Sequence, residues 1–205
     1  MEPHIIKNVI FDLGNVIVRW SPIEIINLTF GNIKKPEKLA KALFKGGIWL
    51  KLNKGLLSES EAKIEYQNEF GFTPRQTDEL FYYIKHTHLL LFGSVRLLKR
   101  LKKAGYKLYA LSDNVTEIID YLKTAYDFWP LFDGITFSQD IGYVKPQPEI
   151  FHHLITKNQI KIEESIFIDD VLSNIEGAQS LGFATIHFEN SLQCKRELEV
   201  LGLSF

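Results

Sequence analysis

The sequence has little cysteine and no excess charge of either sign, and both features narrow what the protein can do. Its 205 residues contain one cysteine, Cys194, which excludes an internal disulfide and fits a reducing compartment. The 24 basic residues are balanced by 25 acidic ones, so there is no cationic surface to favour nucleic acid. No apolar run approaches the length of a membrane span, and we expect no membrane association and a cytoplasmic location.

The first residues also lack a targeting signal. Met1-Glu2-Pro3-His4 runs directly into a strand pattern and leaves no room for a secretory apolar segment. The hydrophobic fraction of 45% is enough for a sizeable core, so we expect one large domain or a domain with an insertion. The 15 Phe and 8 Tyr are scattered along the chain, which favours packing over a base-stacking platform.

Short apolar segments alternate with helical patterns through most of the chain. Strands are predicted at Ile5–Phe11, Lys107–Leu111, Gly134–Phe137, Ser165–Ile168 and Ala184–Phe188. Such alternation is typical of an α/β fold with a doubly wound parallel sheet.

Residues 17–92 break this alternation, because helices are predicted throughout. Ser21-Pro22-Ile23-Glu24 and Thr73-Pro74-Arg75-Gln76 both have the pattern of a capped helix start with proline at the first helical position. Further helices are expected at 36–44 and from Ser58 to the stop at Gly71. We therefore predict an inserted α-helical domain at 17–92, within a core formed by 1–16 and 93–205.

Polar residues follow three of the predicted strands at the point where each ends. They are Asp12, then Ser112-Asp113-Asn114, then Asp169-Asp170, while Lys145 lies in the loop after a fourth strand. Parallel strands bring these ends to one edge of the sheet, where ligands of open α/β folds bind. Taken singly, Asp12 is as well explained as a turn cap, and Asp169-Asp170 as a cap of the following helix.

Taken together, the residues at the strand ends predict a site that binds a cation and a phosphate. Carboxylates in one crevice repel one another unless a hard cation compensates them, and a few oxygen ligands with open water sites suit Mg²⁺. Lys145, the Ser112 hydroxyl and turn amides near Gly14 and Asn15 are groups that bind a phosphoryl dianion. Asp12 is then the candidate nucleophile that forms an aspartyl-phosphate.

The same residues resemble the motifs of the haloacid dehalogenase-like (HAD) hydrolase superfamily, in the subfamily with a helical cap after the first motif. Asp12-Leu13-Gly14-Asn15-Val16 resembles motif I, Leu111-Ser112-Asp113-Asn114 motif II, Lys145-Pro146 motif III and Asp169-Asp170 through Asn174 motif IV. The resemblance is nearest to the branch that writes motif I as Asp-Leu-Gly-Asn-Val. That branch includes glucose-1-phosphate phosphatase and lies near the N-terminal phosphatase domain of epoxide hydrolases.

The resemblance implies a role for each matching residue. Asp12 would be the nucleophile and, with the backbone carbonyl of Gly14 and the carboxylate of Asp170, a ligand of Mg²⁺. Asp169 would act on the metal through water. The phosphoryl oxygens would be held by Ser112, Asn114 and Lys145.

Two positions depart from what the resemblance implies. Most phosphatases of the superfamily place a second Asp two residues after the nucleophile, and this chain has Gly14 there. A cap residue or a substrate group then supplies the proton, or the leaving group departs without full help, or the activity is different. Asp113 is the second departure, because a carboxylate beside Ser112 repels phosphate unless it faces a metal, a cap residue or solvent.

The function expected from these features is Mg²⁺-dependent hydrolysis of a small phosphorylated metabolite, with sugar phosphates as one class. The alternatives are a 2-haloacid dehalogenase and a non-catalytic relative whose cap binds a partner. Trp49 and Lys54 are predicted to contact substrate from the cap, and Trp20 is a further candidate. His86 and His88 lack the spacing of a helical zinc site and are predicted to lie on the surface. The oligomeric state is left open.

Overall fold

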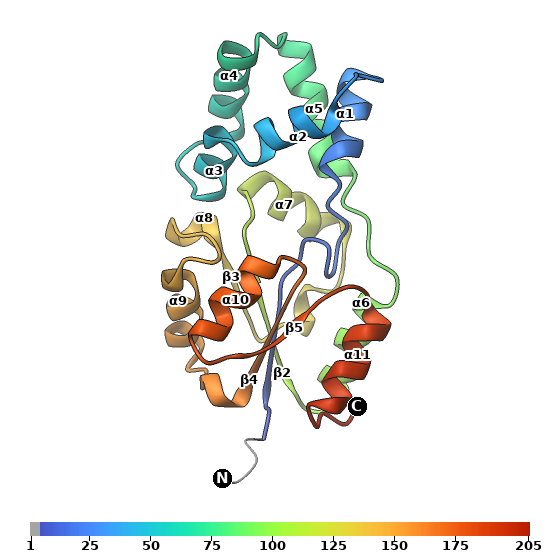
Figure 1. The fold of residues 1–205 in the computed structure, drawn as a ribbon, viewed down its shortest axis with the longest axis vertical. Helices are drawn as coiled ribbons and strands as arrows, with labels where there is room; N and C mark the ends of the chain where they lie inside the picture. The colour runs from blue at the N-terminus through green and yellow to red at the C-terminus, as the bar shows by residue number, and fades with distance from the viewer. Residues whose placement is uncertain (1–4) are drawn as a thin grey trace.

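A five-stranded parallel sheet forms the centre of the molecule (Figure 1). The computed structural model describes residues 5–205, so the predicted lack of a leader falls outside the described residues. The strands are β1 (Asn8–Phe11), β2 (Lys107–Ser112), β3 (Gly134–Phe137), β4 (Ser165–Asp169) and β5 (Ala184–His187), in the order β3-β2-β1-β4-β5. Phe11 on the central strand is in register with Ala110 on one side and Ile168 on the other. The predicted α/β fold class is confirmed.

Helices cover both faces of the sheet, because the central strand is apolar on both sides. Val9 and Phe11 pack into one core and Ile10 into the other, as the two-residue period of a strand requires. The first core includes side chains of α6 (Ser94–Lys103), α7 (Thr116–Ala125) and α11 (Ser191–Val200), and the second those of α9 (Pro148–Asn158) and α10 (Leu172–Ser180). Full burial of each such side chain contributes about 1.5–3 kcal/mol, which holds the strand ends at fixed positions.

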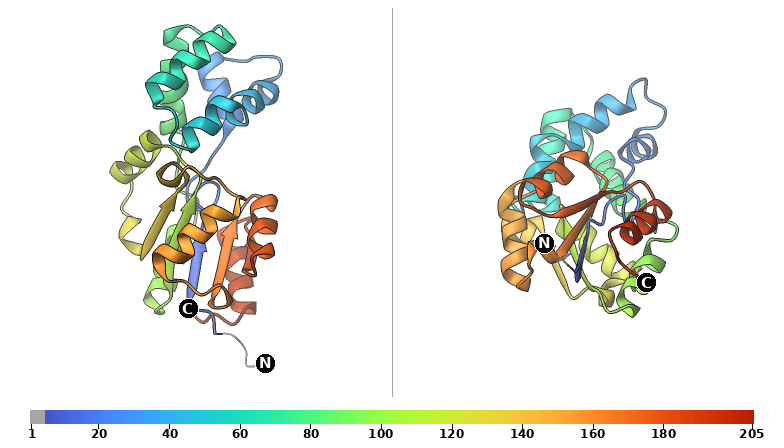
Figure 2. Two further views of the ribbon diagram at one scale, coloured as in Figure 1. Left: turned by 90° about the vertical axis from the view of Figure 1, so that its left-hand side faces the viewer. Right: turned by 60° about the horizontal axis from the view of Figure 1, so that its bottom comes forward.

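Five helices lie together beyond the carboxyl ends of the strands (Figures 1 and 2). They are α1 (Pro22–Phe30), α2 (Pro36–Phe44), α3 (Gly47–Asn53), α4 (Glu59–Phe70) and α5 (Pro74–His86), and we refer to them as the helical insertion. Capping boxes start α4 at Ser58 and α5 at Thr73. The helices predicted from these signals are therefore confirmed.

Other local predictions were wrong or incomplete. Ser21 makes no side-chain cap, and Glu24 pairs with Arg19 instead of closing a capping box. Three helices were not predicted from the sequence: α3, α8 (Ser138–Ile141) and α11. The short 3₁₀ turns Trp129–Leu131 and Ile162–Glu164 were not predicted either. The helices α3 and α8 are too short to show a clear helical period.

Two segments connect the helical insertion to the sheet, and they run antiparallel side by side. The amide of Arg19 donates to the carbonyl of Leu89 at 2.8 Å, and the amide of Leu91 donates to that of Ile17 at 2.9 Å. This pairing is the narrow part between the two halves in Figure 2. Within residues 5–205, no helix combines the length and apolarity that crossing a membrane requires.

Candidate active site

The polar residues that follow the strands converge at one edge of the sheet. Asp12 directly follows β1, Ser112 ends β2 and Asp169 ends β4. One carboxylate oxygen from each of Asp12, Asp169 and Asp170 lies within 4.8 Å of the other two. Oxygen ligands at this spacing suit a hard divalent cation. The arrangement agrees with the predicted convergence of motif residues.

Lys145 is the cation of this cluster. Its Nζ lies 2.8 Å from Asp12 Oδ1 and 2.6 Å from Asp169 Oδ2, and the side chains of Lys145 and Asp169 are almost completely buried. Burial by itself would lower the pKa of Lys145, but the carboxylates of Asp12 and Asp169 outweigh it and raise the pKa. The ammonium group therefore stays charged at neutral pH.

One lysine does not compensate the negative charge around Asp12. Burial raises the pKa of Asp12 to about 7, and the nearby carboxylates of Asp169 and Asp170 add to the rise, against the attraction of Lys145. Burial also raises the pKa of Asp170. A second positive charge at this point would lower the pKa of both carboxyls and favour their ionised form.

Asp169 is held by donors on every side. Its Oδ1 accepts from the amide of Val171 at 2.8 Å, and Nδ2 of Asn174 lies 3.1 Å from both carboxylate oxygens. The helix α10 follows Val171 and has no side-chain cap. Asn174 instead fixes the Asp169 carboxylate, which fits an indirect role at the metal better than direct ligation.

Asn15 connects Asp170 to the chain that enters the helical insertion. Its Nδ2 donates to Asp170 Oδ2 at 3.0 Å, and its Oδ1 accepts from the amide of Trp20 at 2.8 Å. Asn15 has a φ of 51°, a left-handed conformation that asparagine tolerates better than most residues. The Asn15 side chain is therefore engaged at both ends, and its backbone amide, which was expected to bind phosphate, donates to the carbonyl of Val18 at 2.7 Å.

Ser112 and Asn114 retain free donors. The amide of Val115 donates to Asn114 Oδ1 at 2.9 Å, which leaves Nδ2 as the unengaged end of that side chain within residues 5–205. The hydroxyl of Ser112 likewise has no hydrogen-bond partner in the described part of the chain. Both residues line the cavity, so both donors are available to a ligand.

The carboxylate of Asp113 is held by the backbone of the segment that carries Lys145. Its Oδ1 and Oδ2 accept from the backbone amide of Lys145 at 3.0 and 3.2 Å. Burial raises the pKa of this carboxyl, although Lys145 opposes the rise. Asp113 thus ties the segment that carries Lys145 to the end of β2, a role the sequence did not reveal.

A cavity of about 600 Å³ lies between the sheet edge and the helical insertion. We refer to its polar side, at the ends of the strands, as the floor; it is lined by Asp12, Gly14, Asn15, Ser112, Asp113, Asn114, Lys145, Asp170, Ser173 and Asn174. The opposite side, which we refer to as the wall, is lined by Val18, Trp20, Pro22, Phe44, Lys45, Gly46, Trp49, Leu50, Asn53 and His88.

Aromatic rings make up the centre of the wall. Trp20 and Trp49 stack with ring centroids 5.6 Å apart and planes 14° apart. Phe44 meets each of them edge-on at 5.1 Å, and His88 lies 5.3 Å from Trp20. Trp49 therefore lines the cavity as predicted, while Phe44 and His88 were missed because their segments meet only in the fold.

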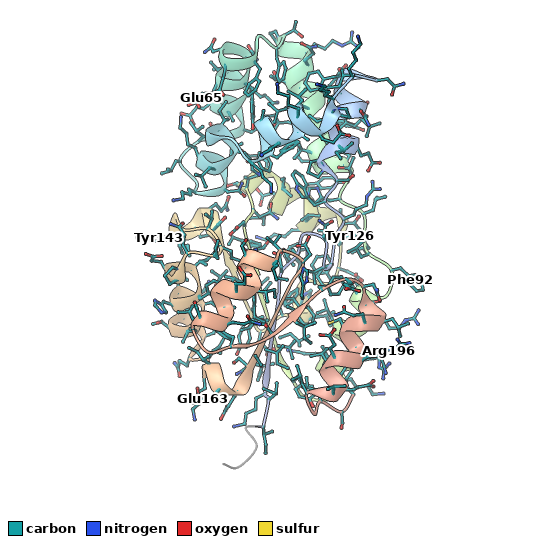
Figure 3. The ribbon with its side chains drawn as sticks, viewed as in Figure 1. Glu65, Phe92, Tyr126, Tyr143, Glu163 and Arg196 are labelled. Carbon is teal, nitrogen blue, oxygen red and sulfur yellow. The ribbon has the colours of Figure 1, made fainter. Side chains whose placement is uncertain are left out.

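His88 is a correction to the predicted surface histidines. His86 is exposed, but His88 is 4% exposed, and its Nδ1 lies 2.6 Å from the carbonyl of Ile84. Burial lowers the pKa of His88 to about 4, so the ring is neutral at ordinary pH. Tyr126, labelled at the junction in Figure 3, donates its hydroxyl to the carbonyl of His88 at 2.7 Å.

Lys54 is not among the residues that line the cavity, although it was predicted to contact substrate. It follows the last residue of α3, five positions after Trp49, and therefore lies roughly 140° around the helix axis from it. Lys45, between α2 and α3, lines the cavity instead and was not predicted.

Comparisons with known proteins agree with this geometry. The chain is 26% identical to a sesquiterpene phosphatase of Aspergillus oryzae, over 95% of this chain and 96% of that protein. It is 29% identical to a D-ribitol-5-phosphate phosphatase of Bacteroides thetaiotaomicron, over 96% and 98% of the two chains. The crystal structure of a HAD family enzyme from the same organism, in complex with magnesium and inorganic phosphate, matches with a TM-score of 0.72 and 26% identity, over 90% of this chain and 95% of that one.

A family model described as haloacid dehalogenase-like hydrolase matches residues 6–182. The match spans the first four strands, the helical insertion and every floor residue named above. The chain belongs to the haloacid dehalogenase-like hydrolase family.

Proposed function

We propose that the protein is a Mg²⁺-dependent phosphomonoester hydrolase that acts on a small phosphorylated metabolite through an aspartyl-phosphate on Asp12. One observation carries the proposal: a buried carboxylate, a buried lysine, a triad of carboxylate oxygens and two free donors all meet at one cavity. The phosphatase names of two relatives that match over almost their whole length support the same reaction class.

The residues of the floor suit a divalent metal. Asp12 and Asp170 would hold it directly, together with the backbone carbonyl of Gly14, and Asp169 would act through a water molecule. The donor set is all oxygen, which suits Mg²⁺. The raised pKa of Asp12 reflects the charge that such a cation would neutralise. When bound, the metal would draw charge from the phosphoryl oxygens and orient the phosphate for in-line attack.

In the first step Asp12 attacks phosphorus. Lys145 binds Oδ1 of Asp12, so Oδ2 is the oxygen left to form the new P–O bond as the bond to the leaving oxygen breaks. Ser112 and Asn114 donate to the phosphoryl oxygens and Lys145 supplies positive charge beside them. These groups are fixed before substrate arrives, so little reorganisation is needed.

In the second step water hydrolyses the aspartyl-phosphate. The bond between phosphorus and Asp12 breaks, inorganic phosphate leaves, and the carboxylate is regenerated. Gly14 offers no side chain to donate the proton in the first step or to activate water in the second. The first step therefore depends on the acidity of the leaving group.

The helical insertion is the part of the protein that would select the substrate and exclude water. We assign residues 17–92 to this cap and residues 1–16 and 93–205 to the core, with the paired connecting segments as the hinge. In the present arrangement Ser138 Oγ donates to the carbonyl of Asn53 at 2.5 Å, and the amide of Glu59 donates to Glu117 at 3.2 Å. Opening the cap would break both contacts.

Phosphate release from a panel of phosphomonoesters, with Mg²⁺ and with excess EDTA, tests the proposed function. We expect turnover that requires Mg²⁺ and returns when Mg²⁺ is restored. Undiminished turnover in EDTA would remove the metal from the proposal. Release of halide from 2-haloacids without metal would replace it with a dehalogenase.

A further inference from the structure

We propose that the wall selects phosphomonoesters whose leaving group carries a planar aromatic ring, in preference to sugar or polyol phosphates. This inference rests on the proposed function, because it names the substrate class of the same site. The two sides of the cavity differ in chemistry. The floor provides every carboxylate and the buried lysine, whereas the wall presents mainly apolar surface.

The centre of the wall offers flat faces. Trp49 lines the cavity, and its ring contacts within residues 5–205 are with Trp20 on one face and with Phe44 at an edge. Trp49 is only partly buried, so the part of the indole that lines the cavity is available to a ring of the ligand. Aromatic rings in offset-stacked or edge-on contact attract one another beyond the burial of their area.

Apolar surface continues from the rings to the mouth of the cavity. Leu50 is 45% exposed and Val171 is 44% exposed, and both line the cavity from opposite sides, one from α3 and the other before α10. Exposed apolar surface at the mouth of a cavity marks a place where a ligand gains by covering it. The buried Ile118, from α7, adds a further apolar contact deeper in the cavity.

Two polar side chains of the wall are already engaged within the protein. Nδ1 of His88 already bonds to the carbonyl of Ile84, and Nδ2 of Asn53 donates to the carbonyl of Trp49 at 2.8 Å. A sugar can place a face on an indole, but each of its hydroxyls then needs a partner, and an unpaired hydroxyl in a desolvated site costs affinity. An aromatic ring has no such requirement.

The wall also carries the indole N–H groups of Trp20 and Trp49. Within the described residues neither Trp20 nor Trp49 donates to a protein acceptor, whereas the indole of Trp129 donates to the carbonyl of Leu122 at 3.1 Å. The edge of the stack can therefore donate to an oxygen substituent on the ring of the ligand.

The absence of an acid at Gly14, on the floor, also favours a leaving group with an aromatic ring. A Cβ at Gly14 would meet Asp12 Oδ2 at 3.8 Å and Trp20 at 3.9 Å, so a Cβ fits at this position, but the chain carries no acid there. When the Asp12 Oδ2–phosphorus bond forms, the electron pair of the breaking bond leaves on the leaving oxygen, which then takes a proton from water. A phenolate holds that charge better than an alkoxide does.

The experiment compares benzyl phosphate with glucose 6-phosphate in Mg²⁺, because both lose a primary alcohol and differ in the ring. We expect the wild-type kcat/KM to favour benzyl phosphate by about tenfold, and Trp49→Leu to reduce that preference by about two- to tenfold, the value of an aromatic contact. Trp49→Phe should keep the preference. Phe92→Leu is the matched control, because Phe92 is 89% exposed and points away from the molecule in Figure 3.

A binding measurement on the wild-type protein tests the aromatic preference even if the Trp49→Leu variant does not fold. Calorimetry on the wild-type protein with Mg²⁺ should show that benzylphosphonate binds about tenfold tighter than methylphosphonate, which has the same anion and no ring. Equal affinities, or equal turnover of benzyl phosphate and glucose 6-phosphate, would overturn the aromatic preference and leave the phosphatase proposal standing. Absence of turnover for every phosphomonoester would overturn the phosphatase proposal and this inference with it.

Discussion

The floor and the wall of the cavity are built in opposite ways. The floor places polar side chains within a residue or two of strand ends, so Asp12, Ser112 and Asp169 are positioned by the register of the sheet. The wall collects Trp20, Phe44, Trp49 and His88 from separate segments of residues 20–88, and only the packing of the insertion brings their rings together. The proposed chemistry therefore sits at the ends of the strands, and the proposed selection of substrate on the part joined to the sheet by two segments.

The difference suggests how each side responds to substitution. A floor residue is bound to several others, as Lys145 is to Asp12 and Asp169, so removing one group unpairs the rest. A wall residue is held by ring contacts that an apolar substitute partly replaces. Floor substitutions should change the rate for every substrate, whereas wall substitutions should change the ratio between substrates.

The largest effect is expected from Asp12→Asn. The change keeps the shape of the side chain and removes the nucleophile, so phosphate release in Mg²⁺ should fall about a thousandfold or more for all substrates alike. Circular dichroism would establish that the variant is folded. Normal turnover by folded Asp12→Asn protein would mean that another group attacks phosphorus.

The next effect concerns stability and comes from His88 on the wall. Its pKa is about 4 in the folded protein, against about 6.5 when unfolded, so between these values the unfolded chain binds a proton that the folded protein does not. The free energy of unfolding should therefore fall as the pH falls from about 6.5 to about 4, by about 3 kcal/mol from this one group.

Urea unfolding of wild type and His88→Gln across that pH range measures the effect. The variant lacks the titrating ring, so its stability should fall less steeply with acid, whatever its stability at pH 7. His153→Gln is the matched control, because His153 is exposed on α9. Parallel slopes for wild type and His88→Gln would show that His88 does not carry the predicted linkage.

A smaller effect is expected from restoring an acid at Gly14. The surrounding space admits a side chain, so Gly14→Asp should raise kcat/KM for phosphates of weakly acidic alcohols by about tenfold and change aryl phosphates little. A series of aryl and alkyl phosphates of graded leaving-group pKa gives the slope for each protein. Gly14→Asn controls for size, and a wild-type slope that is already shallow would mean that another group donates the proton.

The smallest effect is expected from Lys54→Ala. Lys54 lies outside the cavity lining, so KM for any phosphomonoester should stay within about twofold of wild type. Lys45→Ala, which removes the lysine that does line the cavity, is the informative partner. A large rise in KM for Lys54→Ala would mean that the cap closes further over substrate and carries Lys54 inward.

Much of the fold followed from local signals. The sheet, the order of strands and helices along the chain, and the run of helices between β1 and β2 were predictable, because proline starts, capping boxes and short apolar runs act over a few residues. Short elements such as α3 escaped because seven residues hold too little periodicity. Ser21 makes no side-chain cap, and Glu24, its partner in the expected capping box, pairs with Arg19 instead.

The strand-end residues of the floor could be grouped from local patterns, whereas the ring contacts of the wall depend on how the helices pack. Asp12, Ser112 and Asp169 could be placed together because parallel strands in register bring their ends to one edge, whatever the rest of the chain does. What Asn15, Asp113 and His88 contact depends on neighbours more than 25 residues away or on burial, as with Asn15 and Asp170 or Asp113 and Lys145. No local pattern encodes such contacts, because they form only when separate elements pack against one another.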